Sequence, residues 1–522
     1  MASAAQGRPA ASKARPNAPL ADVAQLTARN PALLVIGVMT ASLLQVLDIT
    51  IANVAIPHMQ SSLGASPDTI SWVLTSYIIA SAVAMPITGW LADRIGSRRL
   101  FLISVTTFVF ASMLCGLAQN LEEMVIFRAL QGVGGAFIAP LSQSSLLDTT
   151  RPSRQPQMIA LWGMGVMIGP ILGPVLGGWL TETMDWRWVF FVNVPVGIGC
   201  IAILLAELPS RPLVRRRFDL FGFAMLGLAL ASLQLLLDRG NHVDWFSSME
   251  TWIYIALTIS AAWVAVIHLA TSANPLFDRA LFADINFVVA LIFMVVVGVV
   301  MFATMALLPP MLQNLFGYDV IDTGLVLMPR GIGVLISMQV SGLLLRRGAD
   351  ARWLVAFGFL IGAWSLHEMA AWSLAADRWH FVSTGLVQGL GIGLVFIPLN
   401  ATAFSTLPPR LRTDGSSLLN LTRSVGSSIG ISVVMTLLAR NLQRNHEEIG
   451  AHITPELSSA FDLSTLDRFQ QYGSAALRIA DMEVNRQAAM IAYLNDFELM
   501  KWMSLAAVPL AFLMRRSPRY GR

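Results

Sequence analysis

The run NFVVALIFMVVVGVVMFATMALLPPM at residues 286–311 contains no charged side chain. A helix rises about 1.5 Å per residue, so about 20 apolar residues cross the hydrocarbon core of a bilayer. Residues 286–311 are therefore long and apolar enough to form a transmembrane helix. Similar runs recur along the chain, separated by short polar stretches. This repetition predicts the fold class, an all-α integral membrane protein.

Fourteen spans are predicted, with short connections between most of them. The last span is short, and its helical pattern begins at about Val484, so we expect that helix to start outside the bilayer. The predicted spans lie near residues 32–56, 70–92, 100–118, 123–147, 157–181, 188–208, 219–238, 251–272, 286–311, 322–345, 353–374, 380–404, 416–438 and 498–514.

The composition agrees with a membrane protein. Of the 522 residues, 55% are hydrophobic and 13% are charged, whereas about 25% charged residues is usual in a soluble domain. The formal net charge is +4, and in a membrane chain such a charge reports topology. We therefore expect this chain to contact the lipid bilayer and not to bind nucleic acid.

Arginines predict the orientation of the chain. Loops of one parity carry most of them, whereas the short loops of the other parity hold only Arg187, Arg239 and Arg378. Positively charged loops stay in the cytoplasm, and the basic tails 1–31 and 515–522 fall on that same side. We predict a bacterial cytoplasmic (inner) membrane protein with both termini cytoplasmic. The arginines of the basic loops are Arg94, Arg98, Arg99, Arg151, Arg154, Arg211, Arg215, Arg216, Arg217, Arg279, Arg346, Arg347, Arg352, Arg410 and Arg412.

A weak internal repeat suggests two equivalent halves. QGVG at residues 131–134 of the fourth span matches QGLG at 388–391 of the twelfth, and a proline follows each. Repeated halves around a central cavity are typical of secondary transporters. We predict six-helix halves at 32–208 and 286–514, two inserted helices at 219–272, and a polar outer loop at 441–496. That loop is either a solvated helical segment or a docking surface for a periplasmic partner.

Other classes of protein lack their signatures in this sequence. Neither Lys13 nor Lys501 follows a glycine, so there is no GxxxxGK[ST] phosphate loop, and no cofactor is expected. An integral-membrane enzyme would need clustered His, Asp or Cys ligands, and a receptor would need a soluble output domain. The sequence shows neither signature. Cys115 and Cys200 lie inside predicted spans, and we interpret them as inert thiols that bind no metal.

Residues 89–99, GWLADRIGSRR, resemble the loop signature of the major facilitator superfamily between spans 2 and 3. The resemblance implies a cytoplasmic gate that breaks when that side opens, formed by Gly89, Asp93, Arg94, Gly96 and Arg98. A plain basic loop is the alternative. The copy of this motif in the second half, residues 342–352, is degenerate, because an arginine stands at position 346 where the acid should be.

Residues 47–57, LDITIANVAIP, resemble a motif of the fourteen-span drug:proton antiporter branch of that superfamily, the EmrB/QacA type. Asp48 lies about 24 Å along its span, where an acid costs about 2.5–3.5 kcal/mol even on insertion scales. Arg128 opens RALQGVGG in span 4, which resembles an arginine motif of the superfamily, and lies at about the same depth. We expect Asp48 to bind the coupled proton, with Arg128 as its partner. Helix capping by Asp48 and static pairing by Arg128 are the alternatives.

Span 5 has glycines four residues apart, which places them on one helical face where a second helix can approach closely. The pattern resembles the span-5 motif of antiporters of this superfamily, although packing alone would also explain the glycines. The motif residues are Gly165, Gly169, Pro170, Gly173, Pro174, Gly177 and Gly178.

Four further polar residues lie inside predicted spans. His367 and Glu368 are adjacent in span 11, and an acid beside a histidine suits proton transfer; solvation at the outer end is the alternative. Arg330 in span 10 and Arg423 in span 13 are candidates for substrate binding or coupling. Arg423 can also snorkel to the interface.

Together these resemblances imply a proton-coupled antiporter that exports small amphipathic or hydrophobic drugs by alternating access. An exporter of one metabolite, siderophore or fatty acid on the same fold is the alternative. The expected partners are the small-molecule substrate and protons. In a two-membrane bacterium, a periplasmic membrane-fusion adaptor and an outer-membrane channel are further partners that the family implies.

Overall fold

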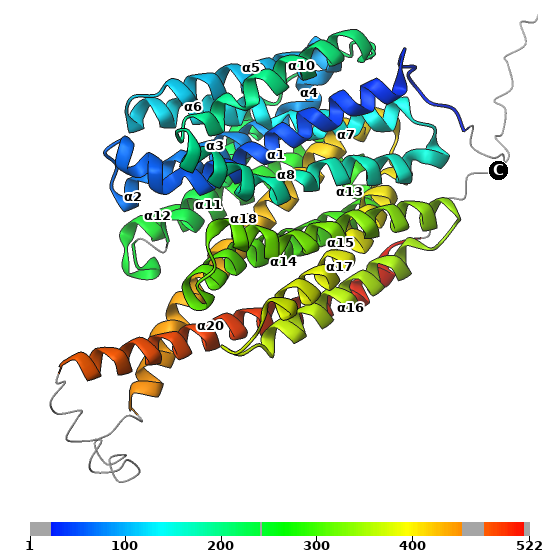
Figure 1. Ribbon diagram of the computed structural model, residues 1–522. Helices are drawn as coiled ribbons and strands as arrows, with labels where there is room; N and C mark the ends of the chain where they lie inside the picture. The colour runs from blue at the N-terminus through cyan, green and yellow to red at the C-terminus, as the bar shows by residue number, and fades with distance from the viewer. Residues whose placement is uncertain (1–21, 241–242, 452–473, 516–522) are drawn as a thin grey trace, which may run out of the picture.

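The computed structural model describes residues 22–240, 243–451 and 474–515. All regular secondary structure in these residues is helical, and the helices form two bundles that lie side by side (Figure 1). The first bundle contains α1 (Pro31–Ser62), α2 (Pro67–Ile70), α3 (Trp72–Ala84), η1 (Met85–Ile87), α4 (Thr88–Ile95), α5 (Ser97–Leu117), α6 (Leu121–Ala136), α7 (Ile138–Thr149), η2 (Pro152–Arg154), α8 (Gln155–Thr183), α9 (Trp188–Phe191) and α10 (Asn193–Glu207).

The second bundle has the same plan as the first. It contains α13 (Ala280–Ala283), α14 (Ile285–Phe316), α15 (Val320–Arg346), α16 (Ala351–Ala370), α17 (Arg378–Ser405), η4 (Pro409–Leu411), α18 (Arg412–Ala451), α20 (Ser474–Leu510) and η6 (Ala511–Leu513). Within it, α15 packs against α17, and α14 packs against α18. The two bundles meet along α8 and α15.

Two helices, α11 (Leu220–Arg239) and α12 (Met249–Thr271), connect the bundles, with the short η3 (Trp245–Ser247) between them. α11 packs against α3 and α18, whereas α12 packs mainly on α11. Its apolar side chains, such as Trp263 and Val266, are exposed. An exposed apolar surface of this extent suits contact with lipid.

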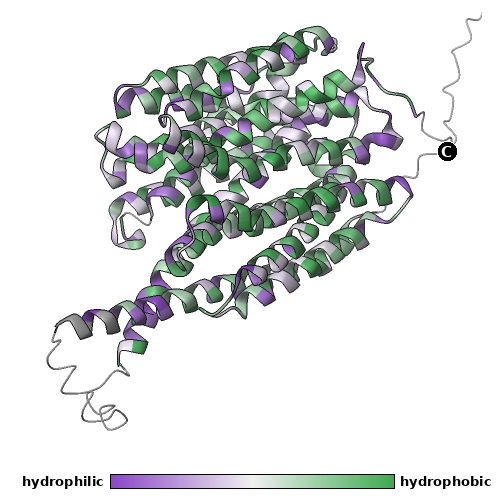
Figure 2. Ribbon diagram, viewed as in Figure 1, coloured by the Kyte–Doolittle hydropathy of each residue, from purple (hydrophilic) through white to green (hydrophobic). Residues whose placement is uncertain are grey.

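Thirteen helices in the described residues are long and apolar enough to cross a membrane, which makes this a multi-pass membrane protein. Hydrophobic residues cover the sides of both bundles, and hydrophilic residues gather at the ends (Figure 2). The fourteenth predicted span corresponds to α20, which stays outside the group of thirteen because Asp496, Glu498 and Lys501 interrupt its apolar second half.

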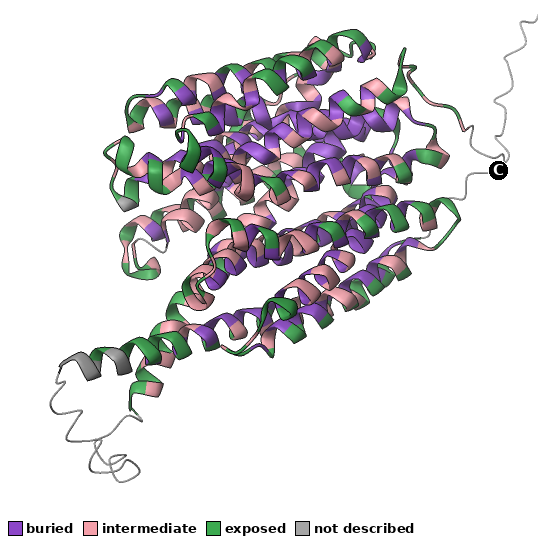
Figure 3. Cartoon of the chain, viewed as in Figure 1, coloured by how far each residue is buried: buried purple, intermediate pink, exposed green. Residues whose placement is uncertain are grey.

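The last helix begins earlier than Val484, where its helical pattern was expected to start. α18 continues to Ala451 and α20 already begins at Ser474, so the predicted outer loop 441–496 is helical where it is described. These polar helix extensions contact each other: Asn445 Nδ2 donates to the Ala488 carbonyl at 3.3 Å. Figure 3 shows that this extension is largely exposed.

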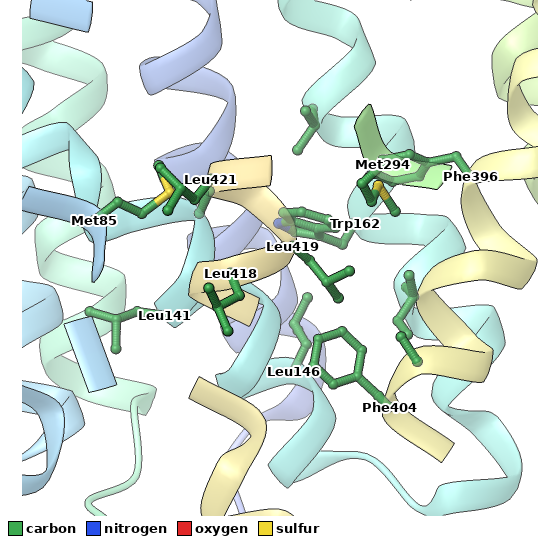
Figure 4. Packing of buried hydrophobic residues seen from close by; sticks show 14 of the residues in the cluster. Met85, Leu141, Leu146, Trp162, Met294, Phe396, Phe404, Leu418, Leu419 and Leu421 are labelled. Atoms are coloured by element: carbon green, nitrogen blue, oxygen red, sulfur yellow. The ribbon is translucent and has the colours of Figure 1, made fainter. Parts of the chain in front are cut away.

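One end of the molecule, here called the basic end, carries the arginine-rich loops 94–99, 211–217 and 410–412. An apolar cluster at this end joins residues of both bundles (Figure 4). The labelled residues are Met85, Leu141, Leu146 and Trp162 from the first bundle, and Met294, Phe396, Phe404, Leu418, Leu419 and Leu421 from the second.

At the opposite end, here called the far end, the bundles have separate apolar clusters. One contains only residues of the first bundle, such as Ile51 and Phe190, and the other only residues of the second, such as Leu307 and Phe497. Because burial of shared apolar surface holds the bundles together, the contact between them is closed at the basic end. This arrangement corresponds to one end state of a two-bundle transporter.

Candidate functional site

A carboxyl group lies buried inside the first bundle. Asp48 of α1 is 1% exposed and Arg128 of α6 is fully buried. Their side chains form an ion pair in which Nη1 of Arg128 lies 2.7 Å from Oδ2 of Asp48. The structure thus brings together the two residues that the sequence placed at one depth.

Two amides complete the environment of this carboxylate. The Nε2 of Gln131 and the Nδ2 of Asn193 each donate to Oδ1 of Asp48 at 2.8 Å. Gln131 is one turn after Arg128 on α6, and Asn193 is the first residue of α10. Asp48 therefore connects α1 to two other helices of its own bundle. The polar groups of Arg128, Gln131 and Asn193 thus compensate the burial of this carboxyl group.

Arg128 is also anchored away from Asp48. Its Nε donates to the Val73 carbonyl at 3.0 Å, and its Nη1 donates to Oε1 of Gln131 at 2.8 Å. The ring of Tyr77 lies 4.7 Å from the guanidinium carbon. Arg128 therefore keeps its place if Asp48 moves, because its other contacts come from α3 and α6.

The ion pair of this cluster ties the position of α1 to that of α6. Protonation of Asp48 removes its negative charge and leaves the Arg128 guanidinium without a counter-ion in apolar surroundings. Breaking a buried ion pair in this way costs about 3–5 kcal/mol, which is enough to favour a different position of α1 relative to α6.

The second bundle has a related site without an ion pair among its described residues. Gln388 Nε2 contacts Thr304 Oγ1 of α14 at 3.3 Å, as Gln131 contacts Asp48 in the first bundle. No acid stands in this copy. Arg330 of α15 lies next to Gly385 and donates from Nη2 to the Met301 carbonyl at 3.0 Å. The two halves are thus alike in backbone and different in charge.

Glycines of α8 hold α1 close. A Cβ at Gly169 would lie 3.1 Å from the Leu47 amide nitrogen, and one at Gly177 would lie 3.3 Å from the Ile51 carbonyl. Gly165 and Gly173 face Met39 and Thr50 of the same helix, whereas Gly178 faces Val320 of α15. Pro170 and Pro174 lie inside α8. The glycine face therefore packs α8 directly against the helix that carries Asp48.

Asp93 of the loop motif lies at the basic end, and its partner is an arginine outside that motif. Arg216, in the loop between α10 and α11, has its Nε 2.9 Å from Oδ2 of Asp93. Its Nη1 donates to Oδ2 of Asp414 in α18 at 3.0 Å. Arg216 thereby joins the first bundle to the second. Burial opposes its charge, but the two carboxylates outweigh that effect and raise the pKa of Arg216 above its ordinary value.

The other motif residues have local contacts. Gly89 leaves room for the side chain of Asp414, and Gly96 ends α4 with φ at 94°, a conformation that favours glycine. Arg94 lies over the Trp90 ring, and Arg98 donates to the Leu205 carbonyl at 2.5 Å. Arg98 thus contacts the last turn of the neighbouring helix α10, and the gate expected at this motif stays a prediction.

A second ion-pair cluster crosses between the bundles at the basic end. Asp148 of α7 pairs with Arg412 of α18, with 3.3 Å between Nη1 and Oδ1, and with Arg211 of the same loop as Arg216. Arg211 also donates to Thr413 Oγ1 at 2.7 Å. The sequence showed Arg211 and Arg216 only as topology signals, because nothing in a loop predicts which acids it will reach.

Buried amides add to this closure. Gln143 of α7 donates from Nε2 to Oδ1 of Asn400 at 2.7 Å, and its Oε1 accepts from Ser416 Oγ at 2.5 Å. Both partners belong to the second bundle. Ionic and amide contacts, together with the shared apolar cluster, seal the basic end.

The remaining predicted residues lie apart from Asp48. Arg423 of α18 is half-buried, lies over the Phe302 ring at 5.8 Å and donates to Asn420 Oδ1 at 3.3 Å. His367 and Glu368 are exposed in the last turn of α16. The structure therefore does not bring His367 or Glu368 into a buried cluster.

A small apolar pocket of about 30 Å³ lies within the second bundle, lined by residues such as Val297, Phe359 and Ile392. Its lining comes from one bundle only, and so it does not mark the path between the halves.

Two helical bundles joined by a closable end, with an ion pair buried inside one of them, define a multi-pass membrane transporter of small molecules and not an enzyme. The chain belongs to the Major Facilitator Superfamily, whose family model matches residues 38–431.

Similar proteins support this assignment. The chain is 36% identical over 502 residues to the multidrug export protein EmrB of Escherichia coli (strain K12), which covers 94% of this chain and 96% of that protein. It is 34% identical over 483 residues to the fatty acid resistance protein FarB of Neisseria gonorrhoeae, covering 91% and 94%. Among solved structures, the human organic anion transporter MFSD10 (TETRAN) aligns with a TM-score of 0.58 at 14% identity, covering 91% of this chain and 99% of that one. That likeness shows the fold.

Proposed function

We propose that this protein is a proton-coupled antiporter that exports small amphipathic or hydrophobic drugs by alternating access. The observation that carries this proposal is the Asp48–Arg128 ion pair, which is fully enclosed in one bundle and has no equivalent ion pair in the described part of the other. Charged groups inside a membrane protein are costly, and they mark proton or substrate pathways.

The coupling follows from the two sites. With Asp48 charged and paired, the basic end is closed by Arg216, Arg211 and the amide cluster. A proton reaching Asp48 weakens the pair with Arg128 and allows α1 to shift. Because the glycine face of α8 packs on α1, and α8 also contacts α15, that shift reaches the contact between the bundles. We infer that it favours opening of the basic end.

The cargo class rests on the relatives. Proteins named for multidrug export are 36% identical along almost the whole chain. A fatty acid exporter is the second candidate, because a protein named for fatty acid resistance is 34% identical over a similar length.

We infer that the basic end faces the cytoplasm of a bacterial cell and that the chain lies in its inner membrane with both termini cytoplasmic. Arginine-rich loops at one end support this orientation. The exposed extensions of α18 and α20 then project outward, where a periplasmic membrane-fusion adaptor, and through it an outer-membrane channel, can dock.

Proteoliposomes with an imposed pH gradient test the proposal. Several unrelated dyes and a fatty acid are offered to the wild type, to Asp48→Asn and to Glu182→Gln, an exposed acid at the end of α8 that serves as control. We expect gradient-driven transport of several dyes by the wild type and the control, and its loss in Asp48→Asn.

Transport of the fatty acid alone would replace the multidrug proposal by the second candidate. Equal transport with and without the gradient would refute proton coupling. Undiminished coupling in Asp48→Asn would remove Asp48 from the mechanism.

A further inference from the structure

α20 buries one regular face. Its buried positions recur every four residues, which places them on a single stripe of the helix. This stripe lies against α14, α16 and α18 of the second bundle. Its members are Val484, Ala488, Ala492, Asp496, Met500 and Ser504.

Asp496 is the acid in the middle of that stripe. It is 1% exposed, and neither of its carboxyl oxygens has a hydrogen-bond partner in the described part of the chain. The other buried aspartates behave differently: Asp48, Asp148 and Asp414 each pair with an arginine. Asp496 thus stands apart from them in having neither a cation nor a donor.

The surroundings of Asp496 are apolar. The adjacent Phe497 lies against Trp372, with 5.8 Å between the ring centroids. Met500, one turn later, accepts from Thr304 Oγ1 of α14 at 3.7 Å. The same cluster includes Leu307 and other side chains of α14.

No cation faces Asp496 from the helices that surround it. α14 has no ionisable side chain. On α16, His367 and Glu368 are exposed in the last turn. On α18, Arg440 is exposed and lies further towards the far end than Asp496. Two further groups stand on α20 itself: Tyr493 is buried one turn before Asp496, and the Lys501 ammonium is held by Glu498 at 2.5 Å.

The position of Asp496 along α20 places it inside the membrane, towards the far end. It lies about 21 Å from the end of α20 at Leu510, within the thickness of about 30 Å of a bilayer core. Trp372, which follows the end of α16, packs on the adjacent Phe497.

We propose that Asp496 is a second proton-binding carboxyl of this transporter, held as the neutral acid in this conformation and exchanging its proton with the far side when α20 moves. A carboxylate with no donor and no cation is costly to bury, whereas the neutral acid is not. Asp48 shows the opposite arrangement, a charge enclosed with its partner. The proposal rests on the proton coupling proposed above and assigns one proton site to each half.

The first experiment uses the wild-type chain in liposomes and does not depend on any variant. Dicyclohexylcarbodiimide, an apolar reagent, adds to protonated carboxyl groups in apolar surroundings, and mass spectrometry locates the product. We expect modification at Asp496 that declines as the pH rises, with Asp48 unmodified. An unmodified Asp496 at neutral and acidic pH overturns the proposal.

The second experiment measures dye transport as a function of pH. In Asp496→Asn we expect a shallower pH dependence, because only Asp48 still titrates, whereas Asp496→Glu keeps the wild-type profile. The control is Glu483→Gln, which changes an exposed acid of the same helix outside the buried stripe and should leave the profile unchanged. Thermal unfolding of each variant verifies that it is folded.

The two proposals fail in different ways. If the wild type itself transports independently of the pH gradient, the proposed function is wrong. If the wild type is driven by the gradient and Asp496→Asn shows the same pH profile, only the assignment of Asp496 is wrong.

Discussion

Removal of the Arg216 side chain should release the basic end. Arg216 is the link between Asp93 of the first bundle and Asp414 of the second. In Arg216→Gln the buried Asp414 carboxylate loses its counter-ion. This change destabilises only the closed state, because the bundles separate when that end opens.

The expected size of the effect follows from the burial. Breaking a fully buried pair costs about 3–5 kcal/mol, and a charge-assisted hydrogen bond contributes about 1.5–3 kcal/mol. The Arg216 side chain is 29% exposed, so solvent screens part of its interaction. We therefore expect about 2 kcal/mol, which shifts the closed-to-open equilibrium about thirtyfold, since about 1.4 kcal/mol corresponds to a factor of ten.

Cysteine accessibility measures that shift. Ser417→Cys introduces a nearly isosteric thiol at a fully buried site, where the serine donates to the Met85 carbonyl across the bundles. The native Cys115 and Cys200 are buried and give little background. With fast opening, the rate of maleimide labelling follows the open fraction, so we expect it to rise about thirtyfold in Arg216→Gln.

The matched control is Arg215→Gln, an exposed arginine in the same loop that leaves both carboxylates paired. Its labelling rate should equal that of the parent. If Arg216→Gln is labelled no faster than Arg215→Gln, the link through Arg216 does not hold the basic end closed.

Three further changes test the packing and hydrogen bonds. Gln131→Leu should destabilise the folded protein by about 1.5–3 kcal/mol, because it removes a donor to a charged carboxylate. Gln388→Leu should destabilise it by only about 0.5–1.5 kcal/mol. Equal losses of stability in denaturant unfolding would contradict the charge difference between the halves. Gly173→Val should abolish dye transport and lower the melting temperature, because its side chain would collide with Thr50 of α1; full activity would show that α8 and α1 do not need this close approach. Gly96→Ala should cost about 1 kcal/mol because of the positive φ at that position, and an unchanged melting temperature would contradict this.

The bundle architecture was predictable because each span is a local property. Twenty consecutive apolar residues form a helix in a bilayer whatever surrounds them, since backbone groups there have no other way to be satisfied. The pairing of Asp48 with Arg128 was predictable for a related reason: charges at one depth inside a membrane have few partners to choose from.

Asp496 was missed for a physical reason. Hydropathy places the start of a span where polar residues end, but α20 continues as one helix through the polar segment, and its buried stripe passes through position 496. The four-residue spacing of apolar residues before and after Asp496 is the signal in the sequence that points to this face.

By itself, the sequence determined the membrane class, the number of spans within about one, the basic end and the acid of the first span, because hydropathy and charge act locally along the chain. Only the tertiary structure decided that Arg216 reaches Asp93, that the apolar cluster shared by the bundles lies at the basic end, and that the Asp496 carboxyl has no hydrogen-bond partner among the described residues. Those features depend on which side chains meet from distant parts of the chain, and such contacts are set by the packing of whole helices.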